Sequence, residues 1–307
     1  KYTLNALALA RQRGDIFGET VLMTNWGSAL RQQGKLAESL TVLFKSLEIA
    51  GANNLSPEIA RTSRRLADVY IDLENFPKAI EYLLQALKID EANENKKSAT
   101  LDHSTLGYTY EKINKLDSAS FHTDKAFQQR NFTPDYNHYL YQVMGNIQEK
   151  KGNYAKAASL FQEGLVLSEK RNDFLTASDI CADFSALYLK INNSDSAIFY
   201  ALNGFKYGQQ GSFKKGIMRS GMLLAELYDS LQPAAALSYY KIAVAAKDSL
   251  FGMDNIQTIQ HLISREETRQ KELENARLSY LNRLKVYGLI TVIAAMLIIA
   301  LLLFRNN

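Results

Sequence analysis

Small residues recur along the chain at a nearly constant interval of forty residues. The intervals are 40, 40, 38, 40 and 40 between Gly27, Ala67, Gly107, Gly145, Ser185 and Ala225. Twelve positions later, or eleven in the sixth unit, come Ser39, Ala79, Ala119, Ala157, Ala197 and Ala236. Seven positions further come Ser46, Ala86, Ala126, Gly164, Gly204 and Ala243. Self-similarity with this period is typical of repeat proteins.

The pattern predicts pairs of antiparallel helices, because two helices approach closely only where the side chains at their crossing are short. Turn-forming residues fall between the helices of each unit, at Gln33-Gly34, Asn75, Asn114, Lys151-Gly152 and Asn192-Asn193. We therefore expect residues 20–246 to form twelve helices in six pairs, without strands. Residues 3–13 resemble the second helix of one more pair, so residues 1–19 are expected to be part of an incomplete repeat, with the chain beginning inside the array.

A large residue follows each of the first small residues by three positions. These residues are Leu30, Tyr70, Tyr110, Gln148, Tyr188 and Tyr228. The combined pattern resembles the tetratricopeptide repeat (TPR) family, although its period is near 40 rather than the family's usual 34. The single tryptophan, Trp26, lies one residue out of the family's register. The resemblance implies an all-α superhelical solenoid of about six helix pairs.

In such a superhelix the first helix of each pair lines a concave groove, where a peptide or protein partner binds. The register gives the candidate ligand-binding residues Thr24, Ser28, Arg31, Arg61, Arg64, Asp68, Ser104, Tyr108, Tyr139, Gln142 and Asn146. Arg61 and Arg64 together form a candidate carboxylate clamp. The alternative is that these residues form a solvated helix face.

The C-terminal part of the chain has a different character. Residues 247–285 are rich in charge, with a seven-residue apolar frame that Glu266, Gln270 and Arg277 interrupt. This pattern fits either a solvated helix or a coiled coil that forms a homodimer through residues 256–285. Residues 286–304 carry no charge, and as a helix they would span roughly 28 Å, close to the apolar core of a bilayer. They predict one transmembrane helix that contacts the lipid bilayer.

The run Lys247–Phe251 followed by a charged helix and one membrane span resembles TPR-containing sensor histidine kinases of the Bacteroidetes type. Residues 305–307 then resemble the start of the juxtamembrane linker. The resemblance implies a single-pass protein of the bacterial inner membrane with a periplasmic TPR region. It also implies two-component signal transduction, with a kinase domain beyond residue 307. Alternatives are a sensor for a helix-turn-helix regulator and a membrane-anchored scaffold for protein–protein interaction.

The charges flanking the span favour the opposite orientation. The twenty residues before it contain Arg269, Lys271, Arg277, Arg283 and Lys285, whereas only Arg305 follows it. The positive-inside rule then places the repeats in the cytoplasm, as in a tail-anchored scaffold. Both orientations therefore remain open.

Composition excludes several kinds of chemistry. The single cysteine, Cys181, excludes an internal disulfide and a cysteine-based zinc site, and the net charge of +4 is too small to indicate a nucleic-acid partner. The sequence contains no H-E-x-x-H, P-loop or G-x-G-x-x-G motif. We therefore predict no catalytic residue, metal or cofactor within these residues. His103 is expected to pack rather than to bind a ligand.

Overall fold

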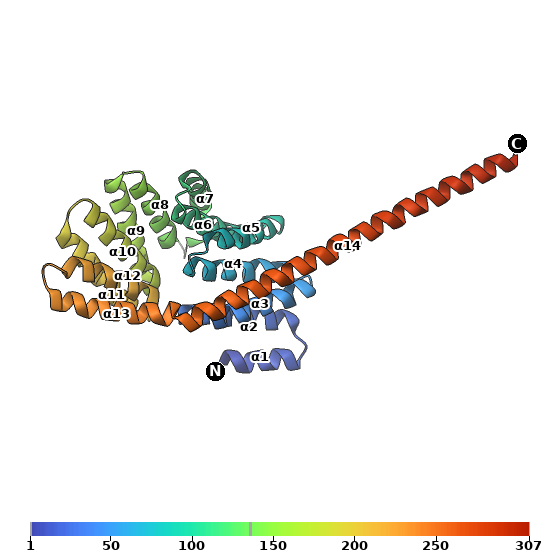
Figure 1. Ribbon diagram of the computed structural model, residues 1–307. Coiled ribbons are helices and arrows are strands. Elements are labelled where there is room, and N and C mark those ends of the chain that lie inside the picture. The colour runs from blue at the N-terminus through green and yellow to red at the C-terminus, as the bar shows by residue number, and fades with distance from the viewer. Residues whose placement is uncertain (1, 135–136, 307) are drawn as a thin grey trace. The chain divides into compact units, whose positions relative to one another are not determined.

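The computed structural model describes residues 2–134 and 137–306, and these residues form helices without any strand (Figure 1). The helices are α1 (Tyr2–Gln12), α2 (Ile16–Gln32), α3 (Leu36–Ala52), α4 (Ser56–Asp72), α5 (Phe76–Ala92), α6 (Lys96–Lys112), α7 (Leu116–Gln128), the short 3-10 helix η1 (Arg130–Phe132), α8 (Asn137–Lys150), α9 (Tyr154–Arg171), α10 (Phe174–Lys190), α11 (Ser194–Gln210), α12 (Lys214–Tyr228), α13 (Pro233–Phe251) and α14 (Met253–Asn306). The chain divides into two compact units, residues 1–257 and 258–307.

Most helices are followed, at regular intervals, by a residue whose backbone adopts the left-handed conformation with a positive φ angle. Such residues occupy positions 14, 34, 54, 74, 94 and 114, and then 152, 172, 192 and 212. The N–H of the following residue donates to a carbonyl five positions back, as Lys35 does to Leu30 and Asn75 does to Tyr70, both at 2.9 Å. This is the Schellman arrangement, which satisfies the last carbonyls of a helix and reverses the chain. Repeated every twenty residues, it produces the forty-residue period.

Helices pair in sequence order from α2 with α3 to α12 with α13, as the small residues predicted. Of those eighteen residues all are buried except Ala225, which is partly exposed. A Cβ atom added to Gly27 would lie 2.6 Å from Leu43 Cδ2, so a larger residue there would separate α2 from α3. Aromatic rings fill the space beside these crossings, with centroids 5.6 Å apart for Tyr70 and Tyr82. The predicted all-α solenoid is confirmed.

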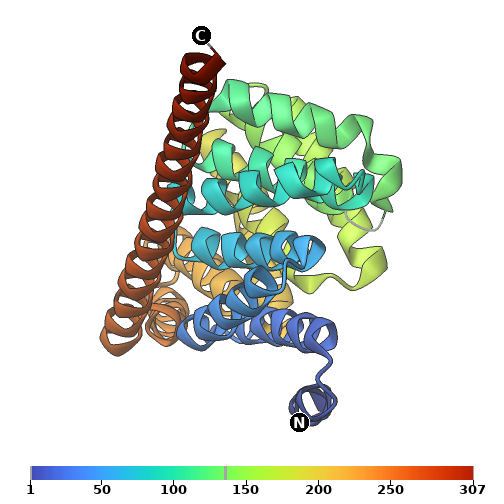
Figure 2. The same cartoon turned by 90° about the vertical axis from the view of Figure 1, so that its right-hand side faces the viewer.

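The solenoid closes on itself, which the sequence did not predict. Lys215 Nζ in α12 lies 3.2 Å from Asp72 Oδ1 in α4, although the two residues are 143 positions apart. Close to this ion pair, Leu250 of α13 packs against Gly34, where an added Cβ would lie 2.8 Å from its side chain. Figures 1 and 2 show α13 (orange) returning beside α2 and α3 (blue). The first and last repeats therefore meet.

The last repeat helix runs on to Phe251 rather than ending at residue 246. Gly252 then interrupts the helix with an extended ψ of 152°, and α14 begins at Met253. A Cβ at Gly252 would lie 2.7 Å from the carbonyl oxygen of Asp248, so glycine is required for this break. The charged segment is therefore joined to the last repeat through a break, rather than continuing it as one helix.

Within α14 the side chains from Lys271 to Leu297 are exposed or partly exposed, and those of residues 298–304 lie outside the described part of the structure. The helical segment Pro233–Leu297 contains one stretch that is long and apolar enough to cross a membrane, judged by length and composition.

Replacing Ala79 with leucine tests the crossings. Ala79 is completely buried between paired helices, so the added carbons must push the helices apart. We expect a loss of about 1–3 kcal/mol in the free energy of unfolding, measured by urea denaturation. The exposed Ala92 on the same helix provides the control, Ala92→Leu. Equal stability of the two variants would contradict the packing described here.

Candidate functional site: the central cavity

A cavity of about 340 Å³ occupies the interior of the closed solenoid. Its walls come from the first helices of the pairs, α2, α4, α6, α8, α10 and α12, as expected for a concave TPR face. The lining residues are Arg31, Gln32, Arg64, Arg65, Asp68, Ile71, Asp72, Leu101, Ser104, Thr105, Tyr108, His138, Tyr139, Gln142, Asp173, Leu175, Thr176, Asp179, Phe213 and Lys215.

An ion network joins α2, α4 and α12 on one wall. Asp72 Oδ2 accepts from Arg31 Nε at 2.6 Å, and Asp72 Oδ1 from Lys215 Nζ at 3.2 Å. Burial alone would raise the pKa of Asp72, but the two cations outweigh it and lower this pKa. Asp72 is the last residue of α4, and Lys215 is the second residue of α12. A negative charge at a helix C-terminus and a positive charge at a helix N-terminus are both unfavourable with the helix dipole. Their pairing offsets both unfavourable placements.

Arg64, which also lines the cavity, forms a second and more deeply buried network. Its guanidinium donates to Asp90 of α5 and to Asp102 of α6, each at 2.5 Å. Asp102 is fully buried, and desolvation together with the nearby Asp90 raises the pKa of Asp102 to about 7, against the opposing effect of Arg64. One guanidinium thus holds two carboxylates and connects three helices.

The part of the cavity lining formed by α8 and α10 carries a histidine held by a carboxylate. His138 Nε2 lies 2.8 Å from Asp173 Oδ2. Asp173 is the N-cap of α10 and also accepts from the backbone N–H of Thr176, which fixes its orientation. The other ring nitrogen, Nδ1 of His138, is buried without a hydrogen-bond partner, as is Ser104 Oγ on α6.

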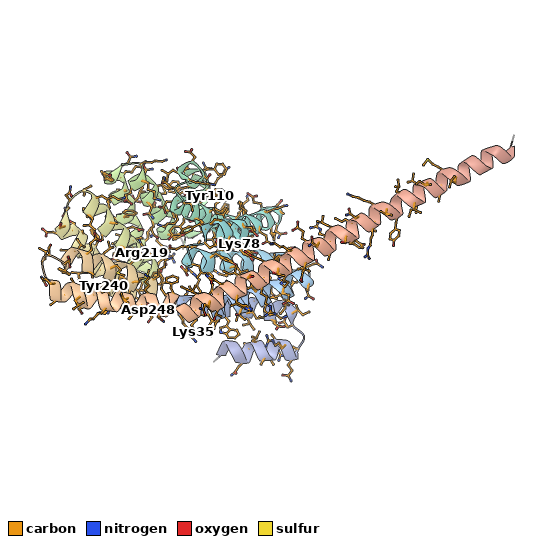
Figure 3. The ribbon with its side chains drawn as sticks, viewed as in Figure 1. Lys35, Lys78, Tyr110, Arg219, Tyr240 and Asp248 are labelled. Atoms are coloured by element: carbon orange, nitrogen blue, oxygen red, sulfur yellow. The ribbon has the colours of Figure 1, made fainter. Side chains whose placement is uncertain are left out.

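A third network holds α8, α10 and α12 together. Arg219, labelled in Figure 3, donates to Asp179 at 2.7 Å and to Asp183 at 2.8 Å. Gln142 also donates to Asp183, at 2.6 Å. Desolvation would raise the pKa of Asp183, yet Arg219 and other partners lower it.

Two tyrosines of the lining, Tyr108 of α6 and Tyr139 of α8, lie beside each other. The rings of Tyr108 and Tyr139 are 5.7 Å apart at their centroids, and Lys112 Nζ lies 4.7 Å from the centre of the Tyr108 ring. Aromatic faces of this kind bind apolar and cationic groups.

The structure brings seven of the eleven candidate residues together around the cavity. They are Arg31, Arg64, Asp68, Ser104, Tyr108, Tyr139 and Gln142. Thr24, Ser28, Arg61 and Asn146 do not line it. Thr24 is buried, and its hydroxyl oxygen lies 2.8 Å from that of Thr62. Arg61 is exposed beside Glu58, whereas Arg64 is held by two carboxylates, so the two arginines do not form a pair aimed at one ligand group.

Several lining residues were absent from the sequence prediction, chiefly Asp72, His138, Asp173 and Lys215. A periodic signal could have revealed Asp72. Ion pairs join neighbouring repeats at one register position, as in Arg31–Asp72, Glu111–Lys150 and Glu149–Lys190. His138 and Lys215 offer no such signal, because their place in the wall depends on how the solenoid closes.

His103 packs between helices, as expected. Its Nδ1 lies 2.9 Å from His122 Nδ1, and the His122 ring stacks on Tyr110. Among the described residues, no group of three or more His, Cys, Asp or Glu side chains is arranged to hold a metal ion.

Residues 19–92 and 140–173 match sequence models of the tetratricopeptide repeat. These segments are tetratricopeptide repeats. No curated protein sequence matches the chain significantly.

Solved structures support the same fold for most of the chain. The apo form of RapI is 14% identical, with a TM-score of 0.60 over 81% of this chain and 97% of that one. A Rap protein complexed with competence and sporulation factor is 16% identical, with a TM-score of 0.60 over 80% and 76%. Aspartyl phosphate phosphatase F from Bacillus subtilis is 13% identical, with a TM-score of 0.54 over 86% and 74%. At these identities the likeness shows the fold alone.

The raised pKa of Asp102 predicts a pH-dependent stability. Between pH 4 and 7 the unfolded chain releases the Asp102 proton while the folded chain retains it. Asp102 therefore contributes a fall in the free energy of unfolding across this window, whereas His122, whose pKa burial lowers to about 4, contributes a rise. In Asp102→Asn the falling contribution disappears, so the free energy of unfolding of the variant, measured by urea denaturation, should increase relative to that of the wild type from pH 4 to 7. The exposed Asp124 offers the control, Asp124→Asn, which should keep the wild-type slope. Parallel curves for wild type and Asp102→Asn would contradict the assignment.

Proposed function

We propose that the chain is the ligand-binding and membrane-anchoring part of a sensor, and that it binds a peptide or a protein segment in the central cavity. The cavity itself carries this proposal. It is lined by polar and aromatic side chains from all six first helices, so one ligand could contact several repeats at once.

Similarity to other TPR structures supports a binding role. One Rap protein of the same fold was solved in complex with competence and sporulation factor. Mixed charged and aromatic surfaces also suit peptides, because main-chain groups need hydrogen bonds while side chains need apolar contacts.

The end of the last repeat supports a signalling role. Leu250 and Phe251 line a small gap at the closure together with Gly34 and Leu36, and the helix break at Gly252 follows directly. Figure 3 labels Lys35, which follows Gly34, and Asp248, which lies two residues before Leu250. A ligand that changes the closure would therefore displace the residues from which α14 begins.

The apolar stretch of the C-terminal segment is the proposed membrane anchor. By resemblance to sensor histidine kinases, α14 carries the signal across the inner membrane to a kinase domain of a two-component system. A membrane-anchored scaffold without signal output is the second candidate, which the five basic residues before the span favour because they argue for cytoplasmic repeats.

Filling the cavity tests the binding function. The full chain in detergent is incubated with a pool of random-sequence peptides 5 to 15 residues long, and retained peptides are identified by mass spectrometry. Ser104→Trp places a large ring in the cavity and should reduce retention at least tenfold. Ser159→Trp, at an exposed position of α9, should retain peptides as the wild type does. Equal retention by wild type and Ser104→Trp would refute binding in the cavity.

Cysteine labelling distinguishes the sensor from the scaffold. In a Cys181→Ala background, Ser159→Cys provides one exposed thiol on the repeats. Labelling by a membrane-impermeant maleimide in cells permeabilised only at the outer membrane supports a periplasmic sensor. Labelling that requires lysis supports the cytoplasmic scaffold. Deletion of residues 286–307 should release the repeats from the membrane fraction in either case.

A further inference from the structure

We infer that the end groove, a surface formed by α12, α13 and the residues that join them, is a docking site for an amphipathic α-helix of another protein. The helix packs its apolar side against α13 and places a lysine or arginine beside Asp229. None of the residues that line this groove lines the central cavity, so the inference does not depend on the ligand proposed there.

The end groove combines apolar and acidic side chains. It has a volume of about 450 Å³, and the large side chains that line it are Met222, Leu237 and Tyr240. Leu237 is 53% exposed, and Tyr240, which Figure 3 labels, is 50% exposed. The charged residues of the lining are Glu226 and Asp229, without any lysine or arginine. Covering the apolar side chains would therefore favour docking of an apolar partner surface.

The preceding repeats show what such a groove holds. Tyr240 lies four positions after Ala236, the small residue of α13. The residues at this position in the five preceding repeats are all 2% exposed or less, and they are Leu43, Leu83, Thr123, Phe161 and Ala201. Each of these second helices contacts the first helix of the next repeat. Because α13 is the last second helix, the end groove has the form of a seat for one more helix.

The junction between α11 and α12 shows how that helix would pack. Leu224 and Leu227, three positions apart on α12, belong to one apolar cluster with Ala201 of α11. Tyr240 takes the place of Ala201 on α13. The docked helix therefore needs two apolar residues three positions apart on the side that faces α13, which is the usual pattern of a helix bound in a groove.

Ion pairs between neighbouring repeats specify a charge on the docked helix. At three junctions the residue four positions after the small residue of a first helix pairs with the next first helix, as in Arg31–Asp72, Glu111–Lys150 and Glu149–Lys190. Asp229 holds this position after Ala225 and forms no ion pair with any described residue. It is also the C-cap of α12, where the helix dipole disfavours a negative charge. A cation on the docked helix is therefore favoured.

The same charge argues against two other occupants. A second copy docked through the same groove would bring the acidic groups of both copies together, which is unfavourable. The chain's own α14 places a carboxylate in the apolar contact, because Glu266 follows Leu227 by thirty-nine positions, the interval between the small residues of the last two second helices. Glu266 is paired instead with Arg269 on its own helix. A basic helix of another protein fits the groove better than either.

One helix of the chain supplies a probe with the required pattern. Met144, Ile147 and Lys150 follow each other at intervals of three on α8, which contacts α6 and α7 in the equivalent place. A fluorescent peptide of residues 137–153 is titrated with the full chain in detergent, and its anisotropy is measured. We expect saturable binding that Tyr240→Asp weakens at least tenfold. The matched control is Phe199→Asp, at a 59% exposed position of α11 outside the groove, which should bind as the wild type does.

A charge exchange tests the contact with Asp229 separately. The peptide carrying Lys150→Glu should bind the wild-type chain about fivefold more weakly than the unchanged peptide. Asp229→Lys should reverse this preference, whereas Asp124→Lys, at an exposed position of α7, should keep it. Since Asp229 is exposed, its substitution should leave the thermal stability of the repeats unchanged.

Each remaining outcome overturns the inference in a distinct way. Equal affinity of the wild type and Tyr240→Asp, or no binding by either, contradicts docking in the end groove. Binding that appears only after Ile263→Asp shows that the chain's own α14 occupies it. A wild-type dimer that Tyr240→Asp converts to a monomer in analytical ultracentrifugation shows that a second copy does. Tyr240→Asp should leave peptide retention by the central cavity unchanged, so failure here is distinguishable from failure of the proposed function.

Discussion

The two helices of each pair approach closely where their crossing point carries a small residue. This close approach sets the angle and distance between the helices throughout the array. At Gly204 an added Cβ would lie 2.6 Å from Ser220 Oγ of the next repeat, so even one carbon would disturb the stacking between units. Because the small residues return with an almost constant interval, each unit turns relative to the previous one by a similar amount. The accumulated rotation brings α12 and α13 back to α2 and α4, and the cavity exists only because the turn closes.

Partly buried charges contribute to this closure. Transferring ions from water to a low dielectric is costly, and a buried ion pair often contributes less stability than an apolar pair of the same size. The side chains of Asp72 and Lys215 are only 13% and 17% exposed. The closure therefore combines the apolar contact of Leu250 with Gly34 and an ion pair whose two side chains also line the cavity.

The repeat fold could be predicted because it is encoded locally. Helix ends, turns and crossings depend on residues close in sequence or one period apart, and small side chains such as Ala79 and Ala119 mark them directly. The candidate site could be predicted only in part, because a rotation of about 100° per residue decides which side of a helix a side chain occupies. Thr24 was assigned to the groove, yet it lies in a cluster of hydroxyls with Ser46 and Thr62. The contact between Asp72 and Lys215 depends on curvature summed over the solenoid, which no local pattern records.

The closure lies directly before the helix break at Gly252, which is where the proposed sensor would connect the cavity with the rest of the chain. Since Gly252 breaks the helix, a movement of α13 need not bend a continuous rod, and it can instead change the angle at which α14 begins. A sensor needs little energy for this purpose, because about 1.4 kcal/mol of differential binding shifts a two-state equilibrium tenfold. One charge-assisted hydrogen bond made in only one of the two states is sufficient. The same ion pairs that shape the cavity can therefore supply the energy difference that a sensor requires.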